Sequence, residues 1–470
     1  MTRVLSVASE CVPLVKTGGL ADVAGALPGA LAACNVDMRT LLPGYPAVMA
    51  GSAGAQVVAD LGDLFGGPAT VRRAGLGDQV LYVLDAPHLY DRAGSIYLGP
   101  DGKDWPDNPE RFAALSWAAA HIAAEGIEGW SPEVLHLHDW QAGLAPVYLH
   151  GIGAAGRVGT LLTIHNIAFQ GLAPENRLEA LRLPRSWYNP GGIEYYGQIS
   201  ALKAGLIAAD KISTVSPTYA SELMTPEFGM GLDGVLRDRQ ADLSGILNGI
   251  DLDVWTPPYN SPGGKAPMTR ALREELGLPE CDGPLCVVIS RLTEQKGLDL
   301  LLNVLPTLLA AGGQLALLGS GDARLEAGFR DAAERHSGVS VRIGYDEALA
   351  HRLIAGGDVI LVPSRFEPCG LTQLYGLRFG TLPLVALTGG LADTVIPASP
   401  AGLAARVATG FQFAPVTANC LRGALMRMCA LWQSPQDWQK MMENAMAHPV
   451  GWDQSARTYA ALYQTLKKVT

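Results

Sequence analysis

The sequence has few charged residues and no long basic run. Asp, Glu, Lys and Arg together make up 17% of the 470 residues, and the formal net charge is −10. General nucleic-acid binding relies on clustered Lys and Arg, so no nucleic-acid partner is expected. A local phosphate site remains compatible with this composition, because about two or three cations in one cleft are enough to hold a phosphate group.

Paired cysteines are also missing. The seven Cys form no C-x-x-C pair, which disfavours a disulfide framework or a zinc site and favours a reducing compartment. The segment Met1–Ala8 lacks the basic-then-apolar pattern of a signal peptide. No apolar run reaches the ~20 residues that span a bilayer. The sequence therefore predicts a cytoplasmic protein with no membrane partner.

Short apolar runs that alternate with helical segments are what the sequence does contain. Such continuous runs predict parallel strands that are covered by helices on both faces. A chain of 470 residues is also too long for one ordinary hydrophobic core. The predicted strands are residues 4–8, 80–84, 134–138, 159–164 and 211–215, followed by 285–289, 314–318, 339–343, 359–362 and 382–385.

A stretch rich in Pro and Gly separates the two groups of strands. Pro257, Pro258 and residues 261–264 follow Asn248–Asp251, and this composition is typical of a linker. We therefore predict an α/β fold with two Rossmann-like, doubly wound domains, residues 1–248 and 249–454, that face each other across a deep cleft. Ligands are expected at the carboxyl ends of the strands. Helical spacing in residues 455–470 predicts a C-terminal helix that packs back on the first domain.

Two cations follow the first strand of the second domain. Arg291 and Lys296 lie in the loop Ser290–Gly297, directly after the strand 285–289. Fixed Arg and Lys side chains can neutralise a leaving nucleoside diphosphate without a metal. The alternative is a solvated loop with ordinary surface cations.

A carboxylate lies in a second strand-end loop, Pro363–Thr372. This loop follows the strand 359–362 and opens a predicted helix at 371–379, where backbone N–H groups can bind phosphate. Glu367 could accept hydrogen bonds from sugar hydroxyls or support positive charge at an anomeric carbon. Its alternative role is a partner for the helix dipole. The next glycine turn, Thr388–Thr394, is adequately explained as a structural loop.

The first domain contributes a glycine loop, Lys16–Asp22, after its first strand. Its spacing matches neither a Walker loop nor G-x-G-x-x-G, which disfavours an NAD-linked oxidoreductase. Gly18 and Gly19 would let a ligand approach the backbone closely, and Lys16 adds a charge. A tight turn with a surface lysine is the alternative.

Two polar loops, 138–144 and 165–171, also follow strands of the first domain. Each begins with a His, which can hydrogen-bond a sugar hydroxyl, although an isolated His is more often structural. Trp140 and Phe169 could stack on the apolar faces of sugars. The two loops therefore favour a carbohydrate subsite.

Together these motifs resemble those of the bacterial glycogen synthases and plant starch synthases, which are retaining glucosyltransferases of the two-domain GT-B architecture. The resemblance extends from the first strand to about Phe413. Lys16–Val23 is similar to the family's donor-binding signature, and Ser290–Gly297 and Pro363–Gln373 match its C-terminal donor loops. The resemblance implies that glucose passes from ADP-glucose to the non-reducing 4-hydroxyl of an α-1,4-glucan, such as glycogen or a maltooligosaccharide, with release of ADP. It implies no metal or other cofactor.

The resemblance also implies a role for individual residues. Glu367, His165, Arg291 and Lys296 are expected to be catalytic. The donor site is expected to contain Lys16, Gly18, Gly19, Arg291, Lys296, Tyr345, Cys369, Gly370, Leu371 and Thr372, with Tyr345 near the adenine. Asp139, His165 and Asn248 are expected on the glucose or acceptor side.

One position departs from the broader class of retaining GT-B enzymes. Many of them have a second glutamate eight residues after the first, where this sequence has Tyr375. The glycogen synthase group shares the change, which leaves the ribose partner unassigned. Because Glu367 is the one convincing carboxylate, we expect front-face substitution through an oxocarbenium-like state and not a glycosidase-type nucleophile. The alternatives are a transferase of the same fold that uses UDP-glucose or a different acceptor, and a glucan-binding or regulatory protein without turnover.

Overall fold

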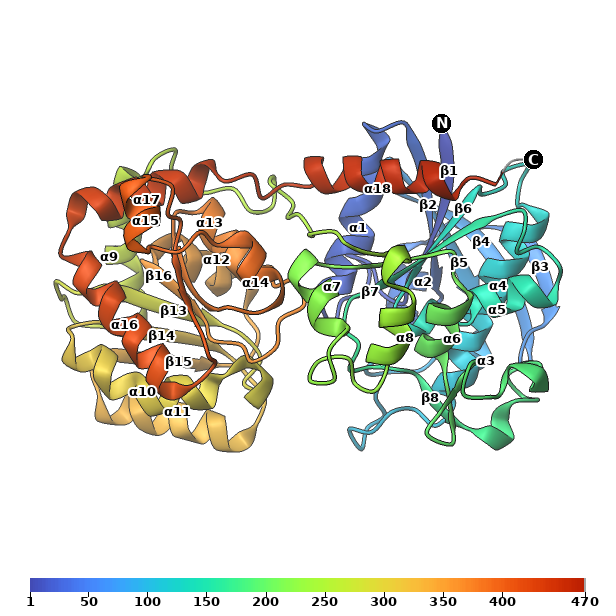
Figure 1. The fold of residues 1–470 in the computed structure, drawn as a ribbon, viewed down its shortest axis with the longest axis horizontal. Helices are drawn as coiled ribbons and strands as arrows, with labels where there is room; N and C mark the ends of the chain where they lie inside the picture. The colour runs from blue at the N-terminus through green and yellow to red at the C-terminus, as the bar shows by residue number, and fades with distance from the viewer. Residues whose placement is uncertain (469–470) are drawn as a thin grey trace. The chain divides into compact units, whose positions relative to one another are not determined.

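The computed structural model describes residues 1–468 of the chain (Figure 1). The chain divides into two compact units. Unit 1 contains Met1–Asn248 together with the chain from Trp452 onwards, and unit 2 contains Gly249–Gly451. No helix in the described part of the chain is both long and apolar enough to cross a membrane.

Unit 1 is built on a nine-stranded sheet whose order is β12-β11-β7-β6-β1-β2-β5-β4-β3. Its strands are β1 (Thr2–Val7), β2 (Val36–Pro43), β3 (Gln56–Asp63), β4 (Pro68–Leu76), β5 (Gln79–Asp85), β6 (Val134–His138), β7 (Gly159–Ile164), β11 (Lys211–Thr214) and β12 (Leu243–Gly245). Neighbouring strands from β12 to β5 are parallel, whereas β4 pairs antiparallel with both β5 and β3.

The antiparallel edge of this sheet was not predicted from the sequence. β3 is exposed or half-buried along its whole length, because an antiparallel hairpin can leave one face in water. A search for continuous apolar runs does not detect such a strand. A small antiparallel sheet was missed for the same reason; its strands are β8 (Leu172–Pro174), β9 (Glu194–Tyr195) and β10 (Gln198–Ser200).

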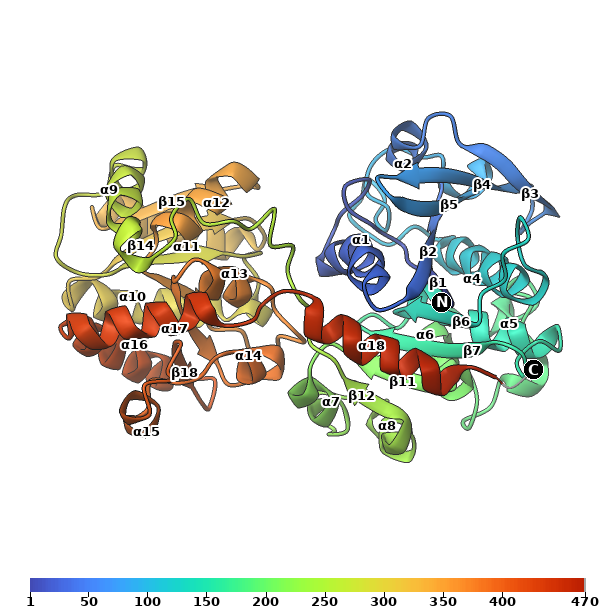
Figure 2. The same ribbon diagram turned by 90° about the horizontal axis from the view of Figure 1, so that it is seen from above.

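Helices cover both faces of the large sheet. On one face, α1 (Gly19–Ala32) and α18 (Asp453–Leu466) bury apolar side chains against β1, β6 and β7. The helix α4 (Asn108–Glu125) packs against β1 and β6 and lies next to α5 (Ala145–Gly151). Figure 2 shows α18, the C-terminal helix, running across β7. The C-terminal helix is therefore an integral layer of unit 1.

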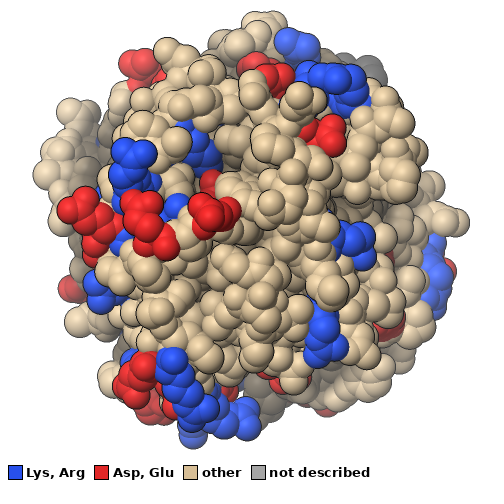
Figure 3. All heavy atoms as spheres, turned by 90° about the vertical axis from the view of Figure 1, so that its left-hand side faces the viewer, with Lys and Arg blue, Asp and Glu red and all other residues tan. Residues whose placement is uncertain are grey.

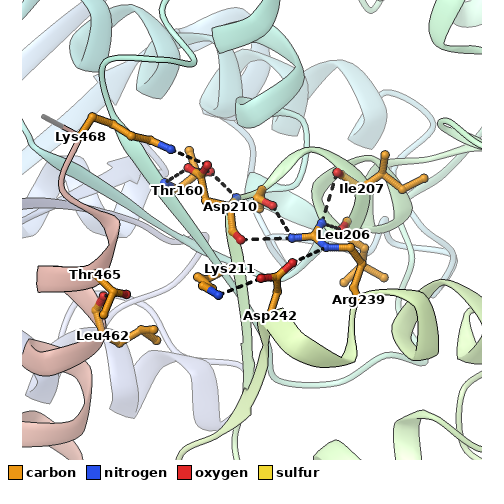
Figure 4. A network of polar contacts seen from close by, with 11 residues as sticks. Thr160, Leu206, Ile207, Asp210, Lys211, Arg239, Asp242, Leu462, Thr465 and Lys468 are labelled. Atoms are coloured by element: carbon orange, nitrogen blue, oxygen red, sulfur yellow. Dashed lines mark hydrogen bonds and ion pairs between the residues drawn. The ribbon is translucent and has the colours of Figure 1, made fainter.

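Polar contacts fasten the end of α18 to the same unit (Figure 4). Lys468 Nζ lies 2.6 Å from the Asp210 carboxylate, which also accepts hydrogen bonds from the backbone N–H and the hydroxyl of Thr160 at 2.8 and 2.9 Å. Arg239 donates to the carbonyls that end α6 (Ala201–Ala208), among them Leu206 O at 2.6 Å. The Arg239 contacts supply donors to carbonyls at a helix end, which have no partner within the helix.

Unit 2 contains a fully parallel six-stranded sheet with the order β15-β14-β13-β16-β17-β18. Its strands are β13 (Leu285–Ile289), β14 (Gln314–Gly319), β15 (Val339–Ile343), β16 (Val359–Val362), β17 (Leu382–Ala386) and β18 (Phe411–Phe413). The order reverses between β13 and β16. In open α/β sheets such a reversal creates a crevice at the carboxyl ends of the two strands, where ligands bind.

Two hydrophobic clusters lie on the two faces of this sheet. Alternate residues of β13 belong to different clusters: Cys286 and Val288 to one, Leu285 and Val287 to the other. The first cluster is completed by α10 (Leu298–Ala310), α16 (Ala418–Trp432) and α17 (Pro435–Ala447), and the second by α9 (Lys265–Leu276) and α12 (Glu347–Gly356). This is the doubly wound arrangement that the apolar strands predicted.

Charged side chains on the face of unit 2 drawn in Figure 3 are mixed in sign. Figure 3 shows acidic and basic groups lying next to one another on this face, with wide uncharged areas between them. Within unit 2, Arg330 and Glu326 on α11 (Ala323–Arg335) form one pair of opposite charges, 3.0 Å apart. The face drawn there therefore has no continuous surface of one charge.

Candidate active site

The strand order of unit 2 brings two predicted loops together. The loops after β13 and β16 lie side by side because these strands are neighbours in the sheet. They line one hollow of about 260 Å³. Its polar lining comes from Ser290, Lys296, Ser364, Glu367 and Thr372.

A buried ion pair joins the two loops inside this hollow. Lys296 Nζ lies 2.6 Å from Glu367 Oε2, and the hydroxyl of Ser364 donates to the same oxygen at 2.9 Å. Glu367 is 8% exposed. A largely buried carboxylate that accepts hydrogen bonds from two donors is fixed in orientation. Glu367 therefore holds the Lys296 ammonium in one position.

Further contacts hold the backbones of the two loops against each other. The Arg365 guanidinium binds Asp299 through two bonds of 2.6 and 2.7 Å and donates to Glu294 O at 2.7 Å. The backbone N–H of Arg365 donates to Gln295 O at 2.8 Å. These bonds flank Lys296 on one loop and Glu367 on the other.

The glycines of the third loop serve the Glu367 loop structurally. A Cβ at Gly389 would lie 1.9 Å from Glu367 O, and one at Gly390 would lie 2.2 Å from Cys369 O. Gly390 N–H donates to Pro368 O at 3.0 Å. Only residues without a side chain permit this approach, in agreement with the structural role expected for Thr388–Thr394.

The remaining predicted donor residues of unit 2 lie at different depths. Cys369 is buried, Gly370 has a φ of +68°, and Leu371 and Thr372 are half-buried at the start of α13 (Thr372–Arg378). Arg291 is exposed, and Tyr345 is 80% exposed with its hydroxyl 3.1 Å from Glu347. The structure therefore brings Lys296 and Glu367 together, whereas the side chains of Arg291 and Tyr345 are exposed.

The ring of Tyr375, at the position of the absent second glutamate, is used in packing. It stacks on Trp255 with ring centroids 3.6 Å apart, and Trp255 stacks on His351 at 4.0 Å. The Tyr375 side chain therefore joins α13 to Trp255 and, through it, to His351 of α12.

In unit 1, the glycine loop is held by a residue that sequence reasoning missed. Glu10 lies just after β1 and accepts hydrogen bonds from the backbone N–H groups of Thr17 and Gly18 at 2.5 and 3.0 Å. Tyr97 donates to the same carboxylate at 3.1 Å. Glu10 is 4% exposed. Its place shortly after a buried strand was the available signal.

Lys16, Gly18 and Gly19 of this loop are open to solvent. Lys16 is exposed and pairs with Asp22 at 2.7 Å. Gly18 and Gly19 begin α1, and a Cβ at Gly18 would meet nothing within 4 Å. Hydrogen bonds to Glu10 thus fix the backbone of the loop, and the space beside Gly18 is open.

Asp139 and His165 meet where β6 and β7 end. Asp139 Oδ1 accepts hydrogen bonds from the backbone N–H of His165 at 2.7 Å and of Asn166 at 3.3 Å. Asp139 has a φ of +54°, an uncommon conformation for a residue with a side chain. Burial raises the pKa of the Asp139 carboxyl to about 7, against the effect of these two hydrogen bonds. Burial lowers the pKa of the His165 imidazole to about 3.

Asn248, Phe169 and Trp140 differ in their exposure and contacts. Asn248 is 8% exposed, and its Oδ1 has no hydrogen-bond partner among residues 1–468. Phe169 is 59% exposed, which suits an aromatic contact surface. Trp140 is different, because it is half-buried and packs edge-to-face on Phe112 at 4.8 Å. Packing against α4 therefore accounts for this ring.

The seven cysteines are free thiols. Among the described residues, no group of three His, Cys, Asp or Glu side chains is arranged to hold a metal ion.

Comparisons with known proteins place the chain in a family. Residues 3–238 match the model of the starch synthase catalytic domain, and residues 283–421 match that of the glycosyl transferases group 1. The glycogen synthase of Paracoccus denitrificans (strain Pd 1222) is 72% identical over 466 residues, which cover 99% of this chain and 100% of that protein. The glycogen synthase of Jannaschia sp. (strain CCS1) is 59% identical and covers 99% of each chain.

A solved structure agrees with these matches. The catalytic domain of starch synthase IV from Arabidopsis thaliana, bound to ADP and acarbose, superposes with a TM-score of 0.88 at 28% identity and covers 100% of both chains. The agreement in fold supports the predicted GT-B class. By full-length identity and by domain content, the chain belongs to the glycogen synthase and starch synthase family of glycosyltransferases.

Proposed function

We propose that this protein transfers glucose from ADP-glucose to the non-reducing 4-hydroxyl of an α-1,4-glucan, with retention at the anomeric carbon and release of ADP. The observation that carries the proposal is the Lys296–Glu367 pair in the hollow between two strand-end loops. It is supported by relatives named glycogen synthase and by the starch synthase IV structure that contains ADP and acarbose.

In this proposal, Lys296 stabilises the leaving group. As the bond between glucose and ADP breaks, negative charge grows on the diphosphate, and a fixed ammonium lowers the free energy of that state. Its ion pair with Glu367 holds it in place without reorganisation. Arg291 is exposed in the same loop, so it can turn towards a bound diphosphate.

We propose that retention proceeds by front-face substitution. Glu367 already binds Lys296 and Ser364, so its carboxylate suits electrostatic support of an oxocarbenium-like sugar better than nucleophilic attack. The acceptor oxygen bonds to the anomeric carbon on the face from which ADP leaves. The proton of the acceptor hydroxyl passes to the departing phosphate oxygen, which balances the reaction without a metal or other cofactor.

The other residues take binding roles in this proposal. Lys16, Gly18 and Gly19 receive the phosphate side of the donor, and Tyr345 lies near the adenine. Cys369, Gly370, Leu371 and Thr372 offer backbone groups to sugar and phosphate, while Asp139, His165 and Asn248 contact glucose or the acceptor. A cytoplasmic location remains a prediction from the sequence.

A transfer assay tests the proposed function. Purified protein is incubated with glycogen and with either ADP-[14C]glucose or UDP-[14C]glucose, and label in polymer is counted before and after digestion with an enzyme specific for α-1,4 links. We expect incorporation from ADP-glucose that this digestion releases. Incorporation only from UDP-glucose would contradict the donor assignment. Glycogen binding without incorporation from either donor would contradict the proposal that the protein is a glucosyltransferase.

A further inference from the structure

We infer that Ser6 and His138 are positioning residues that fix the tautomer of His165, so that the single ring proton of His165 lies on Nδ1. The tautomer follows from contacts inside unit 1. Its effect on glucose transfer rests on the proposed function.

The three side chains form a line through the interior of unit 1. Ser6 Oγ lies 3.1 Å from His138 Nε2, and His138 Nδ1 lies 3.0 Å from His165 Nε2. Ser6 is 1% exposed and His138 is fully buried. Because neither side chain reaches solvent, the Ser6 hydroxyl and the two ring nitrogens of His138 must find their hydrogen-bond partners among these three side chains.

Both rings are neutral. Burial lowers the pKa of His138 well below its ordinary value and that of His165 to about 3. A neutral imidazole has one N–H donor and one bare nitrogen acceptor. Asp139 binds the backbone of His165 and not its ring, so this carboxylate does not choose the tautomer.

The serine hydroxyl decides the direction of the line. Within the described chain, His138 Nε2 is the hydrogen-bond partner of Ser6 Oγ. If Ser6 accepted a proton from His138, its own O–H would be buried without an acceptor, which is costly. Ser6 therefore donates to His138 Nε2, His138 donates from Nδ1 to His165 Nε2, and the proton of His165 is left on Nδ1.

This arrangement limits what His165 can do in the reaction. Its Nε2 is occupied by His138, and its Nδ1 carries a proton, so the ring can donate a hydrogen bond to a substrate oxygen. It has no bare nitrogen with which to act as a general base. The acceptor proton must therefore go elsewhere, in agreement with its transfer to departing ADP.

Ring-nitrogen NMR tests the tautomer without any need for activity. The full chain is labelled with 15N in the rings of its nine histidines, and His165 is assigned from the signals lost in His165→Gln. We expect a protonated Nδ1 and an unprotonated Nε2 at neutral pH. A protonated Nε2 in the unsubstituted protein would overturn the inference, whatever the result of the transfer assay.

Two serine variants separate positioning from general damage to the core. Ser6→Ala removes the hydroxyl that sets the line. Ser213→Ala removes another fully buried hydroxyl of the same sheet, which lies 2.6 Å from Thr163 Oγ1. We expect Ser6→Ala to give mixed tautomers at His165 and to lower kcat about threefold to tenfold, with the KM for glycogen unchanged.

Ser213→Ala should keep both the tautomer and kcat. Equal changes in kcat in the two variants, or an unchanged His165 tautomer in Ser6→Ala, would overturn the positioning role. If neither ADP-glucose nor UDP-glucose is a donor, the proposed function fails while the tautomer measurement still decides the inference.

Discussion

Lys296 and Glu367 lie 71 residues apart in sequence, and their side chains meet at 2.6 Å. The side chains are 18% and 10% exposed, so water weakens this attraction far less than it would at the surface. The contact exists because β13 and β16 are neighbours at the point where the strand order reverses. A lysine held in this way is ready to receive the charge of a departing diphosphate.

Replacing Glu367 with Gln tests whether the carboxylate is needed for more than shape. The amide can still accept from Ser364 but carries no charge to orient Lys296 or to support a cationic sugar. We expect kcat to fall about a hundredfold, measured by glucose incorporation from saturating ADP-glucose. A loss smaller than about threefold, with the fold intact by circular dichroism, would contradict a charged role.

Arg365 offers a comparison with a matched ion pair. It binds Asp299, in the first turn of α10, through two bonds and donates to Glu294 O in the Lys296 loop, whereas Arg352 binds Glu275 through two bonds between α12 and α9. Both pairs are partly exposed, so each contributes about 1 kcal/mol or less to stability. We expect Arg365→Gln to lower kcat about tenfold through displacement of Lys296.

The matched variant Arg352→Gln should retain kcat within about twofold, because its ion pair does not join the donor loops. Thermal unfolding of both variants measures the stability effect separately. Similar kcat values for the two variants would show that the contacts of Arg365 do not position the site.

A methyl group at Gly390 should damage the Glu367 loop. The Cβ of Gly390→Ala would lie 2.2 Å from Cys369 O and 2.6 Å from its Cα, so backbone must move. We expect a lower Tm together with a loss of activity, both measured on the same preparation. An unchanged Tm would show that the loop can shift without cost.

A methyl group at Gly18 should leave the fold intact. The residue has an extended φ of −153°, and its Cβ would have open space. If the donor phosphate approaches this loop, Gly18→Ala should raise the KM for ADP-glucose about tenfold while the Tm stays the same. An unchanged KM would contradict the assignment of this loop to the donor site.

The raised pKa of Asp139 predicts a pH dependence of stability. Its ordinary pKa is about 4, whereas burial raises it to about 7 in the folded chain. Between these values the folded protein keeps a proton that the unfolded chain has released, so stability falls as pH rises through this window. Asp139→Asn does not titrate, and its Tm relative to the unsubstituted protein should increase between pH 5 and 7. Parallel Tm curves would contradict the shift.

The buried parts of the fold could be predicted from sequence, because strands covered on both faces read as apolar runs. Residues 159–164 and 285–289 were predicted with the observed bounds. The exposed strand β3 gave no such signal. The sequence also predicted which loops follow the carboxyl ends of strands. Lys296 and Glu367 were therefore predicted separately as site residues.

What sequence could not give was which side chains meet. The order of strands in a sheet decides that Lys296 faces Glu367, and order is not visible in local patterns. Glu10 was missed because its partners are the backbone N–H groups of Thr17 and Gly18, which carry no residue signature. Sequence also could not show that the ring of Trp140 packs on Phe112, because an aromatic residue beside a polar loop has the same sequence pattern whether it packs or contacts sugar.

The role of Lys296 in stabilising departing ADP is tested most directly by the turnover of Lys296→Ala. Glucose incorporation into glycogen is measured at saturating ADP-glucose for this variant and the unsubstituted protein, with equal Tm values as proof of folding. Loss of one fixed charge at the leaving group predicts a kcat about a hundredfold lower, or roughly 3 kcal/mol of transition-state stabilisation. Near-normal turnover would contradict the account.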